Sequence, residues 1–503
     1  MIVTVILVCF VLVAVVLWTL VGRSKEKERR PPPGPRGLPF VGQGFHLSIN
    51  SAHLQFSKWS KEYGDVFMFS VFGKNVCVLN SPDTIWSAFY EKQLSDYTSD
   101  RPGSFIGQYI ADSYKDILFR RYDDLCKKLK GATIKAMYSS GSGNDIYITQ
   151  QQTEINEFIR KITRDKGNDV NIIEPLETTL CKLIGIMFTG EIMEDSDPAF
   201  KALLDFDHDG NEMITPSVHF VLKILPVLRY FPGYYGDLYR RTVRSRNNLR
   251  AALLNKLKDE FKTKRRECLL HSMFSFQEEE HWLTDDLILG VVMDLINTST
   301  LTSRGVLSGI YFLLVHFQNV QEKICQEIDA VIGQDRQPVP SDLQNMPYTH
   351  ACILETLRYQ SHLGLSATHT NTSSDITIDD YVIPKGTSLY GNQFHVHHDD
   401  MLWVDPWVFK PERFLQENGN VIPREHELRN RYLMPFGVGN RSCMGVTKTF
   451  HRMFLFVTIL LQKHKLLAPS AGKLPSNDPR ELKPGTVLQA PEFKCRVVDR
   501  FSL

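Results

Sequence analysis

The sequence has no Cys-x-x-Cys pair, no excess of one sign of charge and no internal repeat. The nine cysteines stand singly, at Cys9, Cys77, Cys126, Cys181, Cys268, Cys325, Cys352, Cys443 and Cys495. This spacing argues against a zinc module and favours reduced thiols in a cytosolic environment over a disulfide framework. The 58 basic and 57 acidic residues leave a net charge of +1, without the basic excess of nucleic-acid-binding proteins. We therefore expect no nucleic-acid partner.

Charge is also absent from residues 2–22, IVTVILVCFVLVAVVLWTLVG. A helix of this length spans roughly 30 Å, which matches the hydrocarbon thickness of a bilayer. Basic residues follow at once, at Arg23, Lys25, Lys27, Arg29 and Arg30. Because positive charge stays on the cytoplasmic side, the run predicts a transmembrane signal-anchor helix with the rest of the chain in the cytosol. The alternative is a cleaved signal peptide, whose apolar region would be shorter and would end in small residues.

The sequence predicts three segments: the anchor over 1–22, a basic and Pro/Gly-rich hinge over 23–39, and a body over 40–503. Since 43% of the residues are apolar, the body can bury a large core. Apolar periodicity predicts helices over 154–166, 180–188, 243–266, 284–317 and 318–332. Alternation around Gly73 predicts a β-hairpin, and short strands are expected over 372–391 and after residue 463. The expected fold class is mainly α with a smaller β part (α+β).

The stretch PFGVGNRSCMG places Cys443 behind two glycines and an arginine. Gly437 and Gly439 allow positive φ and a close approach of the backbone to a flat ligand. The apolar run after Gly445 is predicted to be helical, so the cysteine precedes a helix amino terminus whose N–H groups favour a thiolate. Arg441 is suited to pair with an anionic group of a cofactor. The pattern suits a cysteine that ligates a haem. In the alternative interpretation, the stretch is a glycine-rich turn with an inert cysteine.

This stretch resembles the haem-binding signature Phe-x-x-Gly-x-Arg-x-Cys-x-Gly of the cytochrome P450 family at every fixed position. The resemblance implies that Cys443 is the axial ligand of the haem iron and that Arg441 contacts a haem propionate. Phe436, which opens the signature, is a further cofactor-binding candidate.

The segment from Ser366 to Phe414 also resembles the family, and His369, His397 and His398 are three of its four histidines. His369 falls where a histidine or arginine of the family often contacts a haem propionate. In the alternative interpretation, His369 is an ordinary polar residue of a strand. His397 and His398 are expected in a solvated loop.

The sequence ETLRYQ places Glu355 and Arg358 three residues apart on one face of a predicted helix. Alone, such a pair is usually a solvated surface contact of little energetic weight. However, the later element KPERFL resembles the family's Pro-Glu-Arg-Phe element and contains Arg413. The resemblance implies a buried structural triad of Glu355, Arg358 and Arg413 behind the haem.

The segment 284–317 resembles the long helix that crosses the distal face of the haem. In the family, an acid followed by a threonine delivers protons there. Thr302 matches the threonine and is a catalytic candidate, but Leu301 stands where the acid belongs. Proton delivery through water or through Thr298 or Thr300 is one alternative. In the other, Thr302 is a helix-internal hydroxyl bonded to a backbone carbonyl.

A second departure from the family lies at residues 122–137, where Leu125 and Leu129 replace a tryptophan and an arginine. Lys128 or Lys130 could meet the propionate charge instead. Four lysines, Lys127, Lys128, Lys130 and Lys135, could also form a basic patch for an acidic electron donor, and the alternative is a solvated helix face.

The resemblance covers nearly the whole chain and looks most like the microsomal branch that contains steroid 17-hydroxylase and the xenobiotic-metabolising members. It implies a cytochrome P450 fold, a catalytic domain over 40–503 and single-pass anchorage in the endoplasmic reticulum membrane. The implied enzyme is a haem-thiolate monooxygenase that inserts one oxygen atom from O2 into a steroid, fatty acid or xenobiotic. Its electrons would come from NADPH through the flavin-containing cytochrome P450 reductase, with cytochrome b5 as a further partner.

Two other functions stay open. An oxygen-independent haem-thiolate isomerase or dehydratase would need no proton-delivering acid, which Leu301 replaces. A non-catalytic haem-binding protein with a degraded distal site is the third interpretation.

Overall fold

The computed structural model describes residues 30–139, 145–164 and 167–501, and the predicted anchor helix lies outside them. The chain divides into two compact units. The first comprises the described residues up to 102 together with 365–396 and 437–442. The second comprises 103–364, 397–436 and 443–503. Within the described ranges, no helix is both long enough and apolar enough to cross a bilayer.

The first unit contains a mixed four-stranded sheet in the order β1-β2-β7-β4. The predicted hairpin is confirmed, because β1 and β2 pair antiparallel from Val66 opposite Leu79 to Val71 opposite Lys74. Phe72 and Gly73 both have positive φ, the backbone twist that a tight two-residue hairpin needs. The elements of this unit are η2 (Ile49–Ser51), α2 (Ala52–Tyr63), β1 (Val66–Val71), β2 (Lys74–Leu79), α3 (Pro82–Phe89), α4 (Lys92–Thr98), β4 (His369–Thr370), β5 (Ile376–Ile378), β6 (Tyr381–Ile383), β7 (Ser388–Gly391), most of α16 (Gln393–His397) and η9 (Gly439–Arg441).

The described part of the predicted hinge packs on this sheet unit. The carbonyl of Pro33 accepts a hydrogen bond from the amide of Met68 in β1, 2.8 Å away, and that of Arg30 accepts one from Val382 in β6, 3.0 Å away. A Cβ on Gly34 would lie 1.9 Å from the carbonyl oxygen of Met68. Residues 30–34 are therefore held by strands and do not run free of them.

The second unit holds most of the helices and a three-stranded sheet in the order β3-β9-β8. Its elements are η3 (Ile106–Ile110), α5 (Asp124–Ser139), α6 (Asp145–Thr163), β3 (Asp169–Val170), α7 (Ile173–Thr189), α8 (Pro198–Met213), α9 (Pro216–Ile224), η4 (Pro226–Tyr230), α10 (Tyr234–Leu249), η5 (Arg250–Asn255), α11 (Lys256–Phe261), α12 (Leu269–Glu279), α13 (Asp285–His316), α14 (Gln318–Val331), η6 (Pro340–Asn345), α15 (Pro347–Gln360), η7 (Pro411–Phe414), η8 (Leu428–Tyr432), α17 (Val446–Lys463), β8 (His464–Leu467), η10 (Pro479–Glu481) and β9 (Cys495–Asp499).

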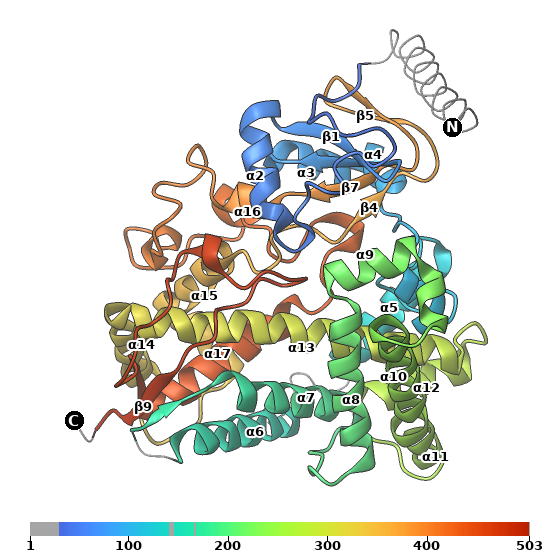
Figure 1. The fold of residues 1–503 in the computed structure, drawn as a ribbon. Coiled ribbons are helices and arrows are strands. Elements are labelled where there is room, and N and C mark those ends of the chain that lie inside the picture. Colours follow the sequence, from blue (N-terminus) through green and yellow to red (C-terminus); the bar gives the residue numbers. More distant parts are fainter. Residues whose placement is uncertain (1–29, 140–144, 165–166, 502–503) are drawn as a thin grey trace, which may run out of the picture. The chain divides into compact units, whose positions relative to one another are not determined.

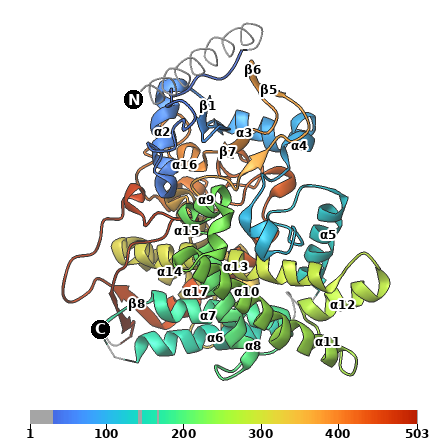
Figure 2. The same cartoon turned by 45° about the vertical axis from the view of Figure 1, so that its right-hand side comes forward.

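The long helix α13 passes through the second unit, and α8 and α10 lie side by side next to it (Figures 1 and 2). Residues at the amino terminus of α13 explain where this helix begins. The Thr284 side chain accepts a hydrogen bond from the amide of Leu287, and Asp285 and Asp286 lie at the positive end of the helix dipole. The predicted helices over 284–317 and 318–332 are confirmed as α13 and α14.

The predicted helix over 243–266 is interrupted. The helix α10 ends at Leu249, a wider π-type turn covers η5, and α11 ends at Phe261. The wider turn keeps Leu253, Leu254 and Leu257 buried on one side. An apolar period cannot distinguish this turn from a regular helix.

Two apolar clusters meet along α13. Its first half, from Leu287 to Ile296, belongs to a cluster with α8, α10 and α12, and its second half, from Val306 to Val315, packs with α15 and α17. Between them, Asn297, Thr298 and Thr302 are only half-buried. The polar, partly accessible stretch of α13 therefore lies between two dry regions.

Candidate active site

The path of the loop before Cys443 depends on two glycines. Gly437 and Gly439 have φ of 68° and 72°, a region that favours glycine. A Cβ on Gly439 would lie 1.8 Å from the carbonyl oxygen of Phe89 at the end of α3, so no larger residue fits there. The amide of Cys443 donates to the carbonyl of Phe436, 2.9 Å away. The cysteine is thus fixed three residues before the start of α17.

The thiol of Cys443 is accessible, whereas the other seven described cysteines are buried. Its Sγ accepts a hydrogen bond from the amide of Gly445, 3.3 Å away. Surrounding protein raises the pKa of the thiol by desolvation, while the Gly445 N–H and the charge of Lys130 act to lower the pKa. An accessible sulfur that faces an N–H donor fits a metal-bound thiolate, because the iron charge would offset the desolvation.

In the first unit, Arg441 and His369 lie close enough for the guanidinium to lower the pKa of the imidazole. The Nε of Arg441 donates to the carbonyl of Ser99, 2.8 Å away. The ring of His369 is buried, stacks on Phe89 with 4.0 Å between ring centroids, and its Nδ1 lies 2.9 Å from the carbonyl oxygen of Thr98. Burial, the first cause, holds the pKa of His369 well below its usual value.

This arrangement constrains what His369 can bind. A carbonyl only accepts, so Nδ1 carries the proton and Nε2 of the neutral ring is left as an acceptor. A propionate contact would therefore require the doubly protonated ring. Arginine keeps its charge at all physiological pH values, so Arg441 is better suited to a carboxylate.

Arg101 is a further cation beside His369 that the sequence did not reveal. It is buried, and its guanidinium donates to the carbonyls of Ala367 and Thr368, 3.0 and 2.8 Å away. Its charge also lowers the pKa of His369. Because these partners lie about 266 positions along the chain, no local pattern marks this arginine.

The structure brings Glu355, Arg358 and Arg413 together in the second unit. Arg358 donates to both oxygens of Glu355 at 2.8 Å, and the Nε of Arg413 lies 3.0 Å from Oε2 of the same carboxylate. The three side chains are 0, 0 and 7% exposed. The amide of Lys410 also donates to Oε1, 2.8 Å away. The carboxylate therefore balances two guanidinium groups in a dry site.

The prediction of a solvated loop at His397 and His398 is wrong, because both are buried. His397 ends α16, its Nε2 accepts from the amide of Met434 at 3.1 Å, and its Nδ1 lies 2.9 Å from Oγ of Ser361. The carbonyl of His397 accepts from Arg358 at 2.7 Å. This histidine thus links the triad to the segment before Phe436. Its burial comes from α15 and residue 434, which are distant in sequence.

The hydroxyls of α13 are bonded within the helix. Thr302 donates to the carbonyl of Thr298, and Thr298 donates to that of Asp294, both at 2.6 Å. Leu301 is buried. This is the helix-internal arrangement that the sequence left open for Thr302, and it leaves the oxygen lone pairs available as acceptors.

A buried acid that the sequence did not reveal contacts α13 from α8. Asp207 is 1% exposed and accepts hydrogen bonds from the hydroxyl of Thr300, from Nδ2 of Asn211 at 2.9 Å and from Sγ of Cys181 at 3.7 Å. Burial raises the pKa of Asp207 to about 6. No residue near Asp207 in sequence indicates that it faces α13.

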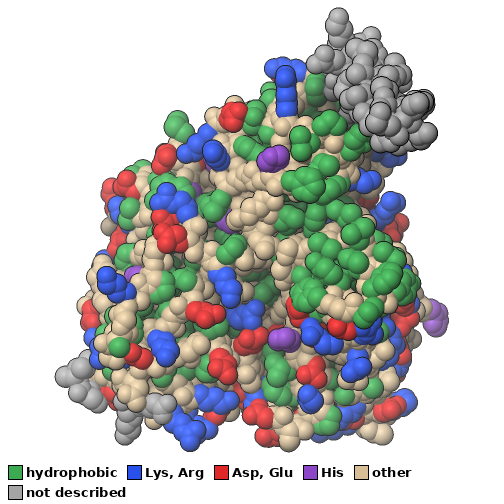
Figure 3. Space-filling model, in the orientation of Figure 1, with side chains coloured by type: hydrophobic (Ala, Val, Ile, Leu, Met, Phe, Trp, Pro, Cys, Tyr) green, Lys and Arg blue, Asp and Glu red, His purple; other side chains and the backbone are tan. Residues whose placement is uncertain are grey.

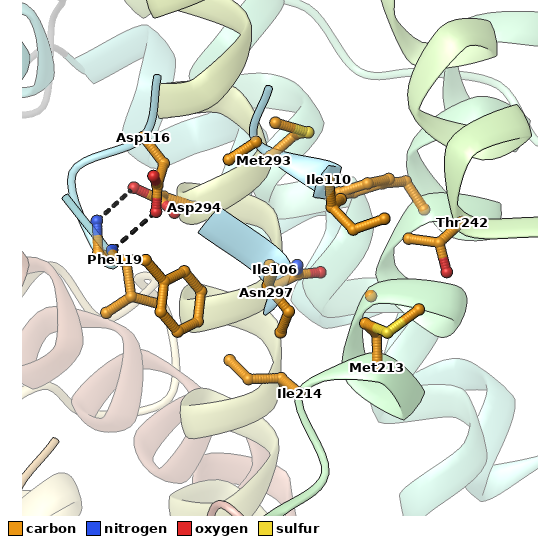
Figure 4. Close-up of a pocket in the computed structure, with 14 residues that line it drawn as sticks. Ile106, Ile110, Asp116, Phe119, Met213, Ile214, Thr242, Met293, Asp294 and Asn297 are labelled. Carbon is orange, nitrogen blue, oxygen red and sulfur yellow. Dashed lines mark hydrogen bonds between the residues drawn. The ribbon is translucent and has the colours of Figure 1, made fainter. Parts of the chain in front are cut away.

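A small cavity lies between η3, α8, α10 and α13 in the second unit (Figure 4). Its walls are mostly apolar, and Asp116, Thr242, Asp294 and Asn297 are its polar residues. The carboxylate of Asp294 accepts from the amides of Ile117 and Leu118, and that of Asp116 accepts from Phe119. Asp294 therefore holds the loop over 116–119 against α13, and Asp116 closes a turn within that loop.

Comparisons with known proteins agree with this geometry. The family described as Cytochrome P450 matches residues 32–497. Cytochrome P450 1A2 of Mesocricetus auratus is 30% identical over 468 residues, which cover 89% of this chain and 88% of that protein. Cytochrome P450 2D20 of the same organism is 28% identical over 477 residues, 93% of this chain and 94% of that protein. Steroid 17-alpha-hydroxylase/17,20 lyase of Ictalurus punctatus is 27% identical over 487 residues, 93% and 92% respectively.

Proposed function

Because the chain belongs to the cytochrome P450 family and is thus a haem-binding monooxygenase, we propose that Cys443 ligates the haem iron of an endoplasmic reticulum enzyme that oxidises an apolar substrate. The observation that carries the proposal is the accessible thiol of Cys443, which faces the amide of Gly445. Bound haem supplies the activation of O2, which a thiolate ligand assists. The Gly445 N–H stabilises negative charge on the sulfur and so tunes its donation to the metal.

Arg441 and Arg101 are the proposed partners of the haem propionates. Both are guanidinium groups near His369, and backbone carbonyls orient both of them. His369 joins them only when it is doubly protonated, which a nearby propionate would favour. Phe436 contributes through its backbone, whose carbonyl fixes the amide of Cys443.

The triad of Glu355, Arg358 and Arg413 serves a structural role in this proposal. Arg358 also donates to the carbonyls of His397 and Pro406, at 2.7 and 2.8 Å. These bonds fix the chain that leads from α15 toward the cysteine loop. A rigid support of this kind holds a metal ligand in position.

Protons are proposed to pass along hydroxyl groups of α13, since Leu301 provides none. Thr302 and Thr298 lie one turn apart, are half-buried and can accept a hydrogen bond from water. Each hydroxyl can hold a proton donor in place, and rotation of the side chain would let it donate a hydrogen bond beside α13.

Membrane attachment is proposed through residues 2–22 and a second, exposed apolar surface. Six exposed large side chains follow one another between α9 and α10: Ile224, Leu225, Val227, Tyr230, Phe231 and Tyr234. Figure 3 shows apolar side chains gathered over this part of the molecule. Contiguous exposed apolar surface of this kind marks contact with a membrane or another protein.

Electrons are proposed to come from NADPH through the cytochrome P450 reductase, with cytochrome b5 as a further partner. Lys127, Lys128 and Lys135 on α5 are exposed and could meet an acidic donor. Lys130 on the same helix lies near Cys443, since its charge lowers the pKa of the thiol.

Turnover of the reconstituted enzyme tests this function. Holoenzyme, reductase and NADPH are incubated with a panel of steroids, fatty acids and drug-like compounds, and NADPH and O2 consumption are measured with product formation. We expect substrate-dependent consumption that ceases without reductase. A haem-loaded protein that couples no substrate to NADPH oxidation would contradict the proposal.

A second candidate is an oxygen-independent isomerase or dehydratase that acts on a lipid hydroperoxide. The buried Leu301 and the internally bonded Thr302 favour it, because such a reaction needs no proton-delivering acid. Conversion of a fatty-acid hydroperoxide without reductase or NADPH would favour this candidate.

A further inference from the structure

The cavity of Figure 4 contains a hydrogen-bonding group that the protein does not use. The Oδ1 atom of Asn297 is buried and has no hydrogen-bond partner among the described residues. In Figure 4, Asn297 lies among the apolar side chains of Ile106, Met213 and Ile214. Buried polar atoms in folded proteins are almost always paired, so an unpaired acceptor in a cavity calls for a partner from outside the chain.

The other polar residues of the cavity already have partners within the protein. Asp294 accepts from two backbone amides, and Asp116 accepts from Phe119. The hydroxyl of Thr242 donates to the carbonyl of Leu238, 2.8 Å away in its own helix. Each of these three residues therefore makes at least one hydrogen bond within the protein.

The backbone of α8 makes room for this amide. A Cβ on Gly210 would lie 2.5 Å from both Oδ1 and Nδ2 of Asn297, so a side chain there would displace the amide. The absence of a side chain at this point of α8 lets the carboxamide of α13 occupy the space. The position of the amide thus depends on two residues from two helices.

The cavity around this group is small. Its volume of about 20 Å3 accommodates roughly one water molecule. A larger ligand enters only when side chains or helices around it move apart. The walls include Ile110, Phe119 and Phe206, which would cover the apolar body of such a ligand.

We propose that Asn297 binds the polar end of the substrate and that this substrate is a neutral apolar compound with a hydroxyl group. The hydroxyl donates its hydrogen bond to Oδ1 of Asn297, and the apolar remainder contacts Ile106, Phe119, Phe206 and Met213. This assignment rests on the proposed function, because the cavity is a substrate pocket only in a haem-dependent enzyme. The neutral Oδ1 of Asn297 can accept a hydrogen bond from a neutral hydroxyl, and this contact buries no additional charge in the cavity.

The test uses three matched probe sets on the haem-loaded full chain. Each set has an alcohol with the matching hydrocarbon and primary amine. The first set is androstan-3β-ol, androstane and 3β-aminoandrostane, and the second is 2-naphthylmethanol, 2-methylnaphthalene and 2-naphthylmethylamine. The third is 1-dodecanol, dodecane and dodecylamine. Binding constants are taken from displacement of one bound reporter ligand, because amines can also coordinate iron. In at least one set, wild type is expected to bind the alcohol about tenfold more tightly than the hydrocarbon.

Four variants assign that preference. Asn297→Leu, which keeps the size, and Asn297→Ala are expected to bring the alcohol-to-hydrocarbon ratio close to one. Gly210→Ala should do the same with the asparagine intact, since its methyl group displaces the amide. Thr242→Val is the matched control and should keep the preference, because its hydroxyl is already bonded within its own helix.

Three results would overturn the assignment. One is no alcohol preference in any set, and another is a preference that survives in both Asn297 variants. The third is tighter binding of the amine that is lost in Asp294→Asn. Each variant is checked for the red-shifted absorbance band of its reduced carbon monoxide complex. A wild-type preparation without that band would contradict the proposed function, whereas an intact band with an unchanged ratio would contradict only the role of Asn297.

Discussion

Two helices of the second unit contain the same ion pair in different surroundings. In α15, Arg358 donates Nε and a terminal nitrogen to the two oxygens of Glu355, and in α6, Arg160 does so to Glu157. Both pairs have the i,i+3 spacing and nitrogen–oxygen distances of 2.6–2.8 Å. The α15 side chains are fully buried, whereas those of α6 are 76 and 32% exposed. Spacing therefore predicts the contact but not its energetic weight.

The difference comes from what surrounds each pair. Glu355 also contacts Arg413 and the amide of Lys410, and Arg358 also donates to three backbone carbonyls. Water competes for the α6 pair and cannot reach the α15 pair. Loss of one charge in the α15 pair leaves its charged partners buried without a counterion. Loss of one charge in the α6 pair leaves a partner that water can solvate.

Removal of the buried carboxylate should have the largest effect. Glu355→Ala leaves two guanidinium groups without their counterion, and we expect a loss of about 3–5 kcal/mol in the free energy of unfolding. Urea unfolding of the holoenzyme measures it. A loss below about 1 kcal/mol would show that the triad is not the dry, coupled site described above.

A buried acid with neutral partners should behave in the opposite way. Burial raises the pKa of Asp207 from 3.8 to about 6, so its stabilising contribution is full below about pH 4 and is lost as pH rises through about 6. Asp207→Asn should therefore gain stability over wild type between pH 4 and 7, by roughly 1–3 kcal/mol. Urea unfolding across this pH range measures the gain.

The control for this variant is Asp205→Asn on the same helix. The Asp205 carboxylate pairs with Lys201 at the surface, 3.3 Å away. Its substitution should leave the pH dependence of stability unchanged. Parallel wild-type and Asp207→Asn curves would contradict the titration of Asp207.

A third test compares two buried arginines. Arg452 in α17 is buried and donates to the hydroxyl of Ser303 at 2.8 Å, and burial lowers its pKa. Arg452→Leu loses a hydrogen bond to a neutral group but no desolvated cation remains, so we expect a net change below about 1.5 kcal/mol. Arg358→Leu should cost at least twice as much in the same urea assay. Equal losses in the free energy of unfolding for Arg452→Leu and Arg358→Leu would show that the carboxylate partner of Arg358 does not determine the cost of its removal.

The exposed pair should show the smallest effect. Glu157→Ala removes the same carboxylate at the same spacing as Glu355→Ala, yet water can solvate Arg160. We expect no measurable shift of the urea midpoint and no change in haem content. A loss comparable to that of Glu355→Ala would remove the basis of the comparison.

Local patterns predicted the elements whose determinants are close in sequence. The apolar period of α13 and the alternation of β1 and β2 were sufficient for those elements. The glycine and arginine pattern before Cys443 likewise pointed to a thiolate in a tight loop, because each determinant lies within ten residues of the sulfur.

Features that depend on distant partners were missed. Asp207 meets Thr300, 93 positions later, and His397 is buried by Ser361 and Met434. The unpaired Oδ1 of Asn297 could not be predicted from the sequence, because the position of this amide depends on Gly210 of another helix. Such contacts between distant residues determine the pKa of a buried group and the ligand that a cavity can bind. Neither apolar periodicity nor a short motif predicts them.

The most direct test of the account is the absorbance spectrum of the reduced protein with carbon monoxide, for wild type, Cys443→Ser and Cys9→Ser. We expect a strongly red-shifted Soret band in wild type and in Cys9→Ser, and its loss in Cys443→Ser, because the band requires a thiolate ligand of the iron. A red-shifted band that survives in Cys443→Ser, or haem-loaded wild type that never shows it, would contradict the assignment of Cys443 as the iron ligand.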